Sequence, residues 1–262
     1  MKYENRVVCF IDILGFREII ESTIAPDGSE IKKNLSNILL ALNRISHMVR
    51  DLHLSIAKSK RITQFSDSIV ISFRYREESE VFMTLISLQH LLIDLAGRHG
   101  VLLRGGISTG KLIHNENLVV GPAMIDAYTL ESKVAKFPRI ILDKKVLDIA
   151  RKSRREGHTA REELEYVKSI ISQDRDGLYY VDYLAKIYEE LDEPELGYPL
   201  YLHKISKIIE EGLAHKSGDI REKYVWLRDK YNEVVIPIKK TAKTFSFEDP
   251  SAAPAYEALL VF

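Results

Sequence analysis

The sequence contains a single cysteine among its 262 residues, Cys9, so it has no internal disulfide framework. One thiol suits a reducing compartment, and its position inside an apolar strand favours a packed side chain over a nucleophile. Basic and acidic residues number 38 each, so no excess charge points to nucleic acid or to an anionic membrane. No apolar run approaches the ~18 residues of a membrane helix, and the first residues, MKYENR, lack the core of a signal peptide. We expect a soluble cytoplasmic protein without membrane insertion.

The composition, 45% hydrophobic and 29% charged, is typical of a globular protein with one large domain or two small ones. In the first half, strand-like and helix-like patterns alternate in the order β-α-β-β-α-β, followed by α-β. Expected strands lie within 7–11, 61–73 (two strands), 101–113, 115–121 and 139–143, and expected helices within 16–24, 31–54, 79–98 and 122–135. This order predicts an α/β (α+β) fold, a ferredoxin-like βαββαβ sandwich with helices on one face of the sheet.

The second half of the chain has a different pattern. Residues 144–172 are charged and helical, 176–184 have the pattern of one more strand, and 199–231 form a long helical pair. No linker separates the two halves, so we expect these helices to pack on the sheet or to build a dimer surface. The last stretch, 246–262, begins polar and ends apolar, which leaves a loose tail and a docked tail equally open.

Two aspartates follow apolar strand patterns at positions that a sheet would bring together. Asp12 follows the strand at 7–11, and Asp67 lies at the tip of the hairpin within 61–73. Two adjacent carboxylates repel each other unless a cation lies between them, whereas with Mg²⁺ or Mn²⁺ they form a hard oxygen site suited to a triphosphate. The alternative is that Asp12 caps the next helix and Asp67 only starts a turn. Gly15, which allows a backbone to approach phosphate oxygens, favours the metal site.

Four sequence blocks carry a family resemblance: FIDILGF, FSDSIVISF, LLRGGISTGKL and VVGPAMIDAYTLESKVAKFPRIILD. In this order they resemble the landmarks of class III nucleotide cyclase domains over residues 6–143. The block GPAMIDAYTLE followed by PRI is most similar to the bacterial pyrimidine (uridylate or cytidylate) cyclases of Pycsar antiphage systems, which make cyclic UMP or cyclic CMP. The GG[DE]EF signature of diguanylate cyclases is absent. The resemblance implies a cyclase-like catalytic core at 1–145 and a helical extension with one more strand at 146–262, packed on that core.

The resemblance also implies a set of metal and phosphate ligands. Asp12 and Asp67 match the aspartates that bind two divalent cations, Mn²⁺ or Mg²⁺, and the carbonyl of Ile13 would complete one metal shell. The segment that holds the β- and γ-phosphates through its amides corresponds to Leu14, Gly15 and Phe16. Lys111 stands where a basic residue can contact the phosphate tail, although a solvated hairpin lysine is an equally open alternative. Arg104, which starts the glycine-rich strand, is expected to be structural.

Two departures from the family pattern concern the base. Thr63 occupies the position of the adenine-reading lysine, and Leu118 that of the acidic base-reading residue. A site rejects a wrong base strongly only when its own polar groups would be left unpaired, so the usual purine contacts are missing. We therefore expect a smaller pyrimidine, with the Thr63 hydroxyl pairing with its O2, O4 or N4 edge. Gln64 alternates to the opposite side of the strand and is expected to be a sheet residue.

A third departure concerns the transition state. The family's asparagine and arginine align with Ile125 and Thr129, and neither side chain can donate as its counterpart does. Asp126 and Lys133 lie near the same helix face, with Lys133 one turn beyond Thr129. Lys133 could supply the catalytic cation, the metals could carry more of the charge, or catalysis could have been lost.

The resemblance further implies a homodimer whose active sites lie between subunits and a substrate 3′-hydroxyl that attacks the α-phosphate and releases pyrophosphate. With UTP or CTP as substrate, the cyclic product would be a second messenger in antiphage defence, sensed by a separate effector. One alternative is an adenylate or guanylate cyclase with atypical base contacts. The other is a catalytically silent nucleotide-binding dimer that signals through its C-terminal helices.

Overall fold

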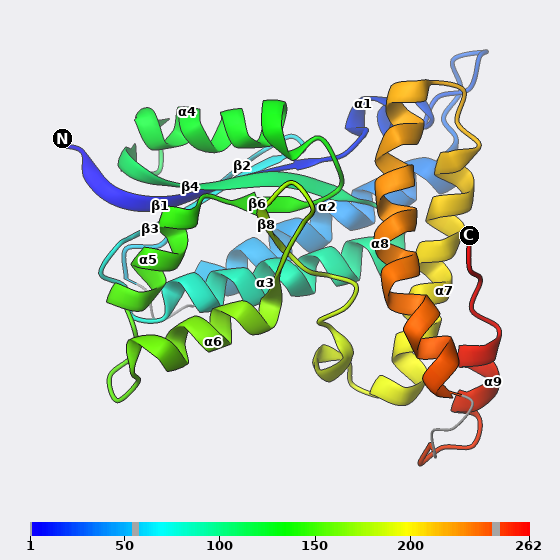
Figure 1. Cartoon of the computed structure of the whole chain (residues 1–262). Helices are drawn as coiled ribbons and strands as arrows, with labels where there is room; N and C mark the ends of the chain where they lie inside the picture. The colour runs from blue at the N-terminus through cyan, green and yellow to red at the C-terminus, as the bar shows by residue number, and fades with distance from the viewer. Residues whose placement is uncertain (1, 54–57, 243–246) are drawn as a thin grey trace.

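The computed structural model describes residues 2–53, 58–242 and 247–262 (Figure 1). The strands are β1 (Glu4–Ile13), β2 (Arg61–Phe65), β3 (Ser68–Arg74), β4 (Leu103–His114), β5 (Val119–Val120), β6 (Ile140–Leu142), β7 (Ile171–Gln173) and β8 (Tyr179–Val181). The helices are α1 (Phe16–Glu21), α2 (Lys32–His53), α3 (Glu80–Asp94), α4 (Pro122–Thr129), α5 (Lys144–Lys152), α6 (Ala160–Ile170), α7 (Pro194–Leu213), α8 (Gly218–Ala242) and α9 (Ala252–Glu257). Short π- or 3₁₀-helical turns are η1 (Leu95–His99), η2 (Leu130–Ala135) and η3 (Tyr188–Glu190).

The strands form one mixed sheet in the order β2-β3-β1-β4-β6-β8-β7, with β5 paired to β4. The long central strand β1 is antiparallel to both β3 and β4, and β6 joins β4 in parallel. A parallel partner needs a crossover connection, which α4 and η2 supply between β4 and β6. The predicted α/β sandwich with βαββαβ order is therefore confirmed.

Helices cover both faces of this sheet, as Figure 1 shows with α4 on one side and α2, α3 and α6 on the other. Alternate side chains of β1 contribute to two separate cores: Val7 and Cys9 to a large one, and Val8 to a small one that also contains Ala123 and Ala127 of α4. We call the side with the small core the α4 face. The prediction that helices lie on one face only is wrong for α4, because strand periodicity does not specify which side a following helix will cover.

Gly106 of β4 explains how α4 lies so close to the sheet. A Cβ atom at this position would lie 2.5 Å from the carbonyl oxygen of Ala127 and 2.5 Å from Cβ of Leu130. Any side chain there would push the junction of α4 and η2 away from the strand. The glycine-rich pattern of β4 thus sets the height of this helix above the sheet.

The second half of the chain continues the same sheet. Strands β7 and β8 form an antiparallel hairpin, and β8 pairs with β6. The sequence predicts one strand here, whereas the structure has two. The sequence does not indicate β7, because this strand is only three residues long and follows α6 directly, so it shows no alternation of polar and apolar residues. Since the sheet crosses from the first half into the second, the division at residue 145 stays a prediction.

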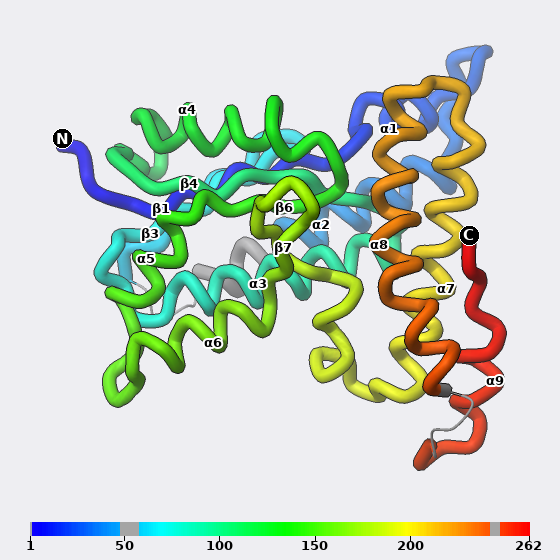
Figure 2. The backbone as a smooth tube through the Cα atoms, in the orientation of Figure 1, coloured from blue at the N-terminus to red at the C-terminus, as the bar shows by residue number. Residues whose placement is uncertain are grey.

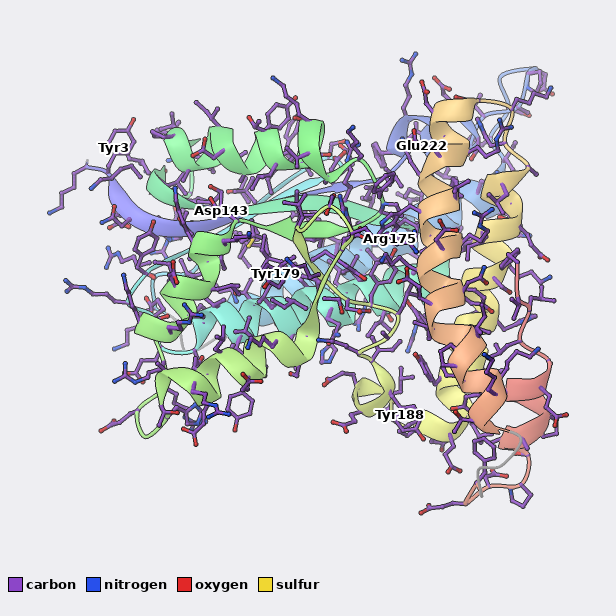
Figure 3. All side chains as sticks on the ribbon, in the orientation of Figure 1. Tyr3, Asp143, Arg175, Tyr179, Tyr188 and Glu222 are labelled. Atoms are coloured by element: carbon purple, nitrogen blue, oxygen red, sulfur yellow. The ribbon has the colours of Figure 1, made fainter. Side chains whose placement is uncertain are left out.

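Helices α7 and α8 form the predicted long helical pair and stand against one end of the sandwich (Figures 1 and 2). A buried network ties α8 to the sheet edge: Arg139, just before β6, binds Asp174 and Asp176, and Trp226 of α8 donates its indole N–H to Asp174 at 2.7 Å. Nearby on the surface, Arg175 points toward α8 (Figure 3) and pairs with Glu233 at 2.9 Å.

The C-terminal stretch docks on this helical pair. Residues Ala252, Tyr256 and Leu259 are buried, and Lys239 of α8 donates to the carbonyl oxygen of Glu257 at 2.8 Å. Of the two alternatives for the tail, the docked one is therefore observed for residues 247–262.

One helical segment, Glu80–His99, which comprises α3 and η1, is long and apolar enough to span a membrane by length and composition alone. Its apolar side chains, such as Leu88 and Leu92, belong to the large core under the sheet. A buried core helix passes the same test, so burial against the sheet accounts for this composition.

Candidate functional site

The structure brings Asp12 and Asp67 together at one end of the sheet. Asp12 is the penultimate residue of β1, and Asp67 lies in the turn between β2 and β3. The β1–β3 pairing ends at Ile11 opposite Ile69, which places Asp12 beside the start of β3. The Ser68 hydroxyl donates to Oδ1 of Asp12 at 3.0 Å.

The environment of Asp12 disfavours its charged form. Burial and the neighbouring Asp67 carboxylate raise the pKa of Asp12 to about 7, and the hydrogen bond from Ser68 only partly opposes this. A cation placed between the two carboxylates would offset this repulsion. Asp12 does not cap the following helix, because the N-cap of α1 is Gly15 and no side chain bonds there.

The donor set suits a hard divalent cation but is incomplete within one chain. Among the described residues no group of three or more His, Cys, Asp and Glu side chains is arranged to hold a metal ion. Two carboxylates together with the nearby backbone carbonyl of Ile13 would leave coordination positions for phosphate oxygens and water, as Mg²⁺ sites at triphosphates usually do.

An ion pair lies next to Asp12 on the α4 face. Arg104 is the β4 residue directly opposite Asp12, and its Nε donates to Oε1 of Glu131 at 2.6 Å. Glu131, on η2, is only 2% exposed, and its charge adds to the raised pKa of Asp12. Sequence reasoning missed Glu131; its only signal was its place in the block TLESK, beside the residues considered there.

The turn after β1 offers two amide donors. Gly15 adopts a left-handed conformation with φ 73°, which explains the glycine. The Leu14 amide already donates to the carbonyl oxygen of Leu102 at 2.8 Å. The amides of Gly15 and Phe16 have no backbone acceptor among the described residues, so of the three predicted phosphate contacts these two are available.

Thr63 lies on the α4 face, like Asp12, and contacts a histidine that sequence reasoning missed. Its Oγ1 is 3.0 Å from Nε2 of His114, whose Nδ1 is 2.8 Å from Oγ of Ser72. Burial and the nearby charges of Arg6 and Arg61 lower the pKa of His114 to about 4, so the ring is neutral. His114 and Gly106 are an even number of residues apart on one strand, so strand alternation would have predicted that both lie on the same face.

Gln64 lies on the opposite face, as strand alternation predicts. Its Oε1 accepts a hydrogen bond from the hydroxyl of Ser46 on α2 at 2.9 Å. It is therefore a sheet residue in contact with α2.

The two lysines of the predicted site form no ion pair with Asp12 of the same chain. Lys111 alternates to the other face of β4 and pairs with Asn5, seven positions from Arg104, which is about 23 Å along the strand. Lys133 is exposed on η2 and forms no ion pair with any residue that the structure describes. Lys111 is therefore remote from the carboxylate pair of its own chain, and Lys133 forms no ion pair with either carboxylate.

Large apolar side chains are exposed on α4, on β5 and the residue before it, and at the end of β2. These residues are Phe65, Leu118, Val120, Ile125 and Tyr128. Phe65 is 80% exposed and Ile125 is 66% exposed, which is unusual for side chains of this size. We refer to these five residues as the apolar patch.

No protein-family model matches the sequence, and no curated protein matches it either. Several solved structures are similar to parts of the fold. They include the guanylyl cyclase domain of a RhoGC fusion protein from Blastocladiella emersonii (14% identity, 69% of this chain and 96% of that chain, TM-score 0.45). An adenylate/guanylate cyclase/hydrolase from Silicibacter pomeroyi is 15% identical over 70% of this chain and 99% of that one, with a TM-score of 0.41. A class III adenylyl cyclase-like ATP-binding protein from Pseudomonas aeruginosa is 13% identical over 94% of this chain and 73% of that one, with a TM-score of 0.38. Similarities this distant assign neither a family nor an activity.

Proposed function

We propose that this protein is a class III-like nucleotide cyclase that converts UTP or CTP to the 3′,5′-cyclic monophosphate and pyrophosphate. The observation that carries the proposal is the pairing of Asp12 and Asp67 at adjacent strand ends, with the Asp12 pKa raised to about 7. A carboxylate pair without a protein cation is suited to receive one from solution. The sequence blocks that resemble this family place the same two residues in its metal site.

Asp12 and Asp67, with the carbonyl of Ile13, would hold two divalent cations, Mn²⁺ or Mg²⁺. When bound, such cations lower the pKa of a substrate hydroxyl and neutralise the triphosphate. The chain itself would then orient the phosphates through the amides of Gly15 and Phe16, at the start of α1. Thr63 would contact the base.

We propose that the working unit is a homodimer with each site between two copies. The apolar patch supports an interface on the α4 face, because exposed apolar side chains of this kind mark interaction surfaces. Lys133, which is exposed on η2, would then approach the site of the partner, whereas Lys111, on the other face of β4, is less well placed for the predicted contact with the phosphate tail. Lys133 would offset charge that develops on the α-phosphate.

The cyclic product would serve as a cytoplasmic second messenger in antiphage defence and would act on a separate effector. This part of the proposal rests on the sequence resemblance alone. A purine cyclase with atypical base contacts is a second candidate. A silent nucleotide-binding dimer is the third, favoured by Ile125 and Thr129, which cannot donate as the family's transition-state residues do.

Incubation of the purified protein with each of the four nucleoside triphosphates and Mn²⁺, followed by mass spectrometry, tests these candidates together. The expected product is cyclic UMP or cyclic CMP. Cyclic AMP or cyclic GMP as the main product would contradict the pyrimidine proposal, and nucleotide binding without any cyclic product would favour the silent dimer.

A further inference from the structure

A continuous chain of hydrogen bonds runs from Arg6 to Thr63 across the α4 face. Arg6, 2% exposed, donates through Nε to Oγ of Ser72 at 2.9 Å. Ser72 Oγ lies 2.8 Å from Nδ1 of His114, and the other ring nitrogen, Nε2, lies 3.0 Å from Oγ1 of Thr63. The four residues come from four different strands, so the sheet itself fixes their order.

Which group donates in each of these hydrogen bonds follows from Arg6, at the buried end of the series. A guanidinium group can only donate, so the Ser72 oxygen accepts from Arg6. Ser72 is fully buried, and its hydroxyl contacts only Arg6 and His114 among the described residues. Its single hydrogen must therefore go to Nδ1 of His114, since a buried hydroxyl hydrogen without an acceptor is costly.

The protonation of His114 then determines which group donates in its hydrogen bond with Thr63. His114 is neutral and carries one ring proton, because burial and the two neighbouring arginines lower its pKa to about 4. With Nδ1 accepting from Ser72, that proton is on Nε2, and the ring donates to the oxygen of Thr63. The Thr63 hydroxyl hydrogen then has no acceptor among the described residues and remains available to a ligand.

The space beside His114 is large enough for a nucleobase. Two hollows of about 580 and 330 Å³ share the lining residues Arg61, His114 and Asn115; Thr63 lines neither, but its neighbour Ile62 and its partner His114 line the larger one. Volumes of this size are within the range of small-molecule sites.

We infer that Arg6, Ser72 and His114 fix the hydroxyl of Thr63 as a hydrogen-bond donor, and that this donor selects uracil over cytosine. This selection requires that Thr63 meets position 4 of the ring, where uracil presents the carbonyl oxygen O4, which accepts, and cytosine presents an amino group, which only donates. The inference rests on the proposed function for the presence of a pyrimidine at Thr63. Arg6, Ser72 and His114 are positioning residues, since they act through Thr63.

The direction of the chain can be measured without any substrate. Long-range ¹H–¹⁵N correlation spectra of the imidazole rings at pH 7, with His114 assigned by its absence in His114→Gln, report which ring nitrogen carries the proton. We expect Nε2 to be protonated and Nδ1 to be bare. A proton on Nδ1 would overturn the inference whatever the protein catalyses.

The consequence for the base is measured by binding. We expect the α,β-methylene analogue of UTP, which cannot release pyrophosphate, to bind about tenfold more tightly than that of CTP in the presence of Mn²⁺. Thr63→Val should remove this preference and Thr63→Ser should keep it. His114→Gln, whose amide can rotate to donate or accept, should also remove it. Gln64→Ala, altered on the opposite face, should leave the ratio unchanged.

These outcomes separate the inference from the proposed function. Equal binding of the two analogues, or tighter binding of the CTP analogue, would overturn the inference even if a cyclic pyrimidine nucleotide is produced. Uridine-selective binding that depends on Thr63 would support the inference even if no triphosphate is cyclised, in which case the proposed cyclase activity fails. A loss of selectivity in Thr63→Ser as large as that in Thr63→Val would also count against a role of the hydroxyl.

Discussion

The aspartate pair Asp12 and Asp67 differs from the pair Asp174 and Asp176 in whether a cationic side chain lies between the carboxylates. Asp174 and Asp176, at the β7–β8 turn, share the guanidinium of Arg139, and Asp174 also contacts Lys230 at 3.0 Å. Burial acts to raise the pKa values of both, but hydrogen bonds and the nearby cations lower them below the ordinary range. At Asp12, burial and Asp67 raise the pKa to about 7.

This contrast separates a structural cluster from a candidate cation-binding site. In the Arg139 cluster, cationic side chains neutralise the carboxylates, and the cluster holds α8 against the sheet edge. The Asp12 pair is incomplete, although Arg104 lies opposite Asp12 in the sheet, because its guanidinium is directed to Glu131. A fold that places an arginine so close and pairs it elsewhere leaves room for a cation from solution.

The largest expected effect is a loss of stability when the pair Asp174 and Asp176 loses its shared cation. Arg139→Met removes the shared cation and leaves two carboxylates, one of them buried, so we expect a loss of roughly 3–5 kcal/mol in the free energy of unfolding. Urea unfolding at pH 7 measures it. The control is Arg175→Met, which breaks the exposed pair with Glu233 and should cost less than about 1 kcal/mol. Equal losses in the two variants would contradict the distinction between the pairs.

The incomplete pair should instead be critical for activity. Asp67→Asn keeps the shape of the side chain but removes a ligand charge, and we expect cyclisation to fall by at least about a hundredfold at saturating Mn²⁺. The exposed Asp192→Asn is the matched control and should retain full activity. Near-normal turnover by Asp67→Asn would show that this aspartate is no metal ligand.

The stability of the protein should also depend on pH through Asp12. Because its pKa is raised from 3.8 to about 7, the folded protein binds more protons than the unfolded chain, and this contribution to stability is lost as the pH rises from about 4 to 7. Asp12→Asn removes the effect. We therefore expect the difference in the free energy of unfolding, variant minus unaltered protein, to be about 1–2 kcal/mol larger at pH 8 than at pH 4. This value is smaller than the full pKa shift would give, because Asp12 is partly exposed. Thermal unfolding without divalent metal at the two pH values measures this difference, and a parallel pH dependence in both proteins would exclude the raised pKa.

The smallest effect is expected at Ser68. Its hydroxyl stabilises the charged form of Asp12, so Ser68→Ala should raise the pKa of Asp12 by roughly 0.5–1. Titration of the Asp12 carboxyl carbon by NMR measures the change. A lower pKa in the variant would mean that the hydroxyl does not donate to the carboxylate.

Much of the fold follows from local patterns in the sequence. Strand and helix periods predict the βαββαβ order, and the hairpin at Asp67 and the strand at Asp12 could be predicted to converge because consecutive strands usually pair. The side of the sheet that α4 covers could not be predicted, since it depends on the empty space above Gly106. The contact between Thr63 and His114 joins residues 51 positions apart and depends on strand order, so only the structure reveals it.

The close approach at Gly106 has a mechanical consequence. Ala127 and Leu130 lie against the backbone of β4 at Gly106, so the C-terminal end of α4 cannot move toward the sheet, and the Arg104–Glu131 pair ties the next residue to the same strand. We therefore expect this end of α4 and the sheet to move together. In the proposed dimer, a cleft between two copies would then open and close by rotation of whole subunits, with the hinge located at the interface and not within either chain.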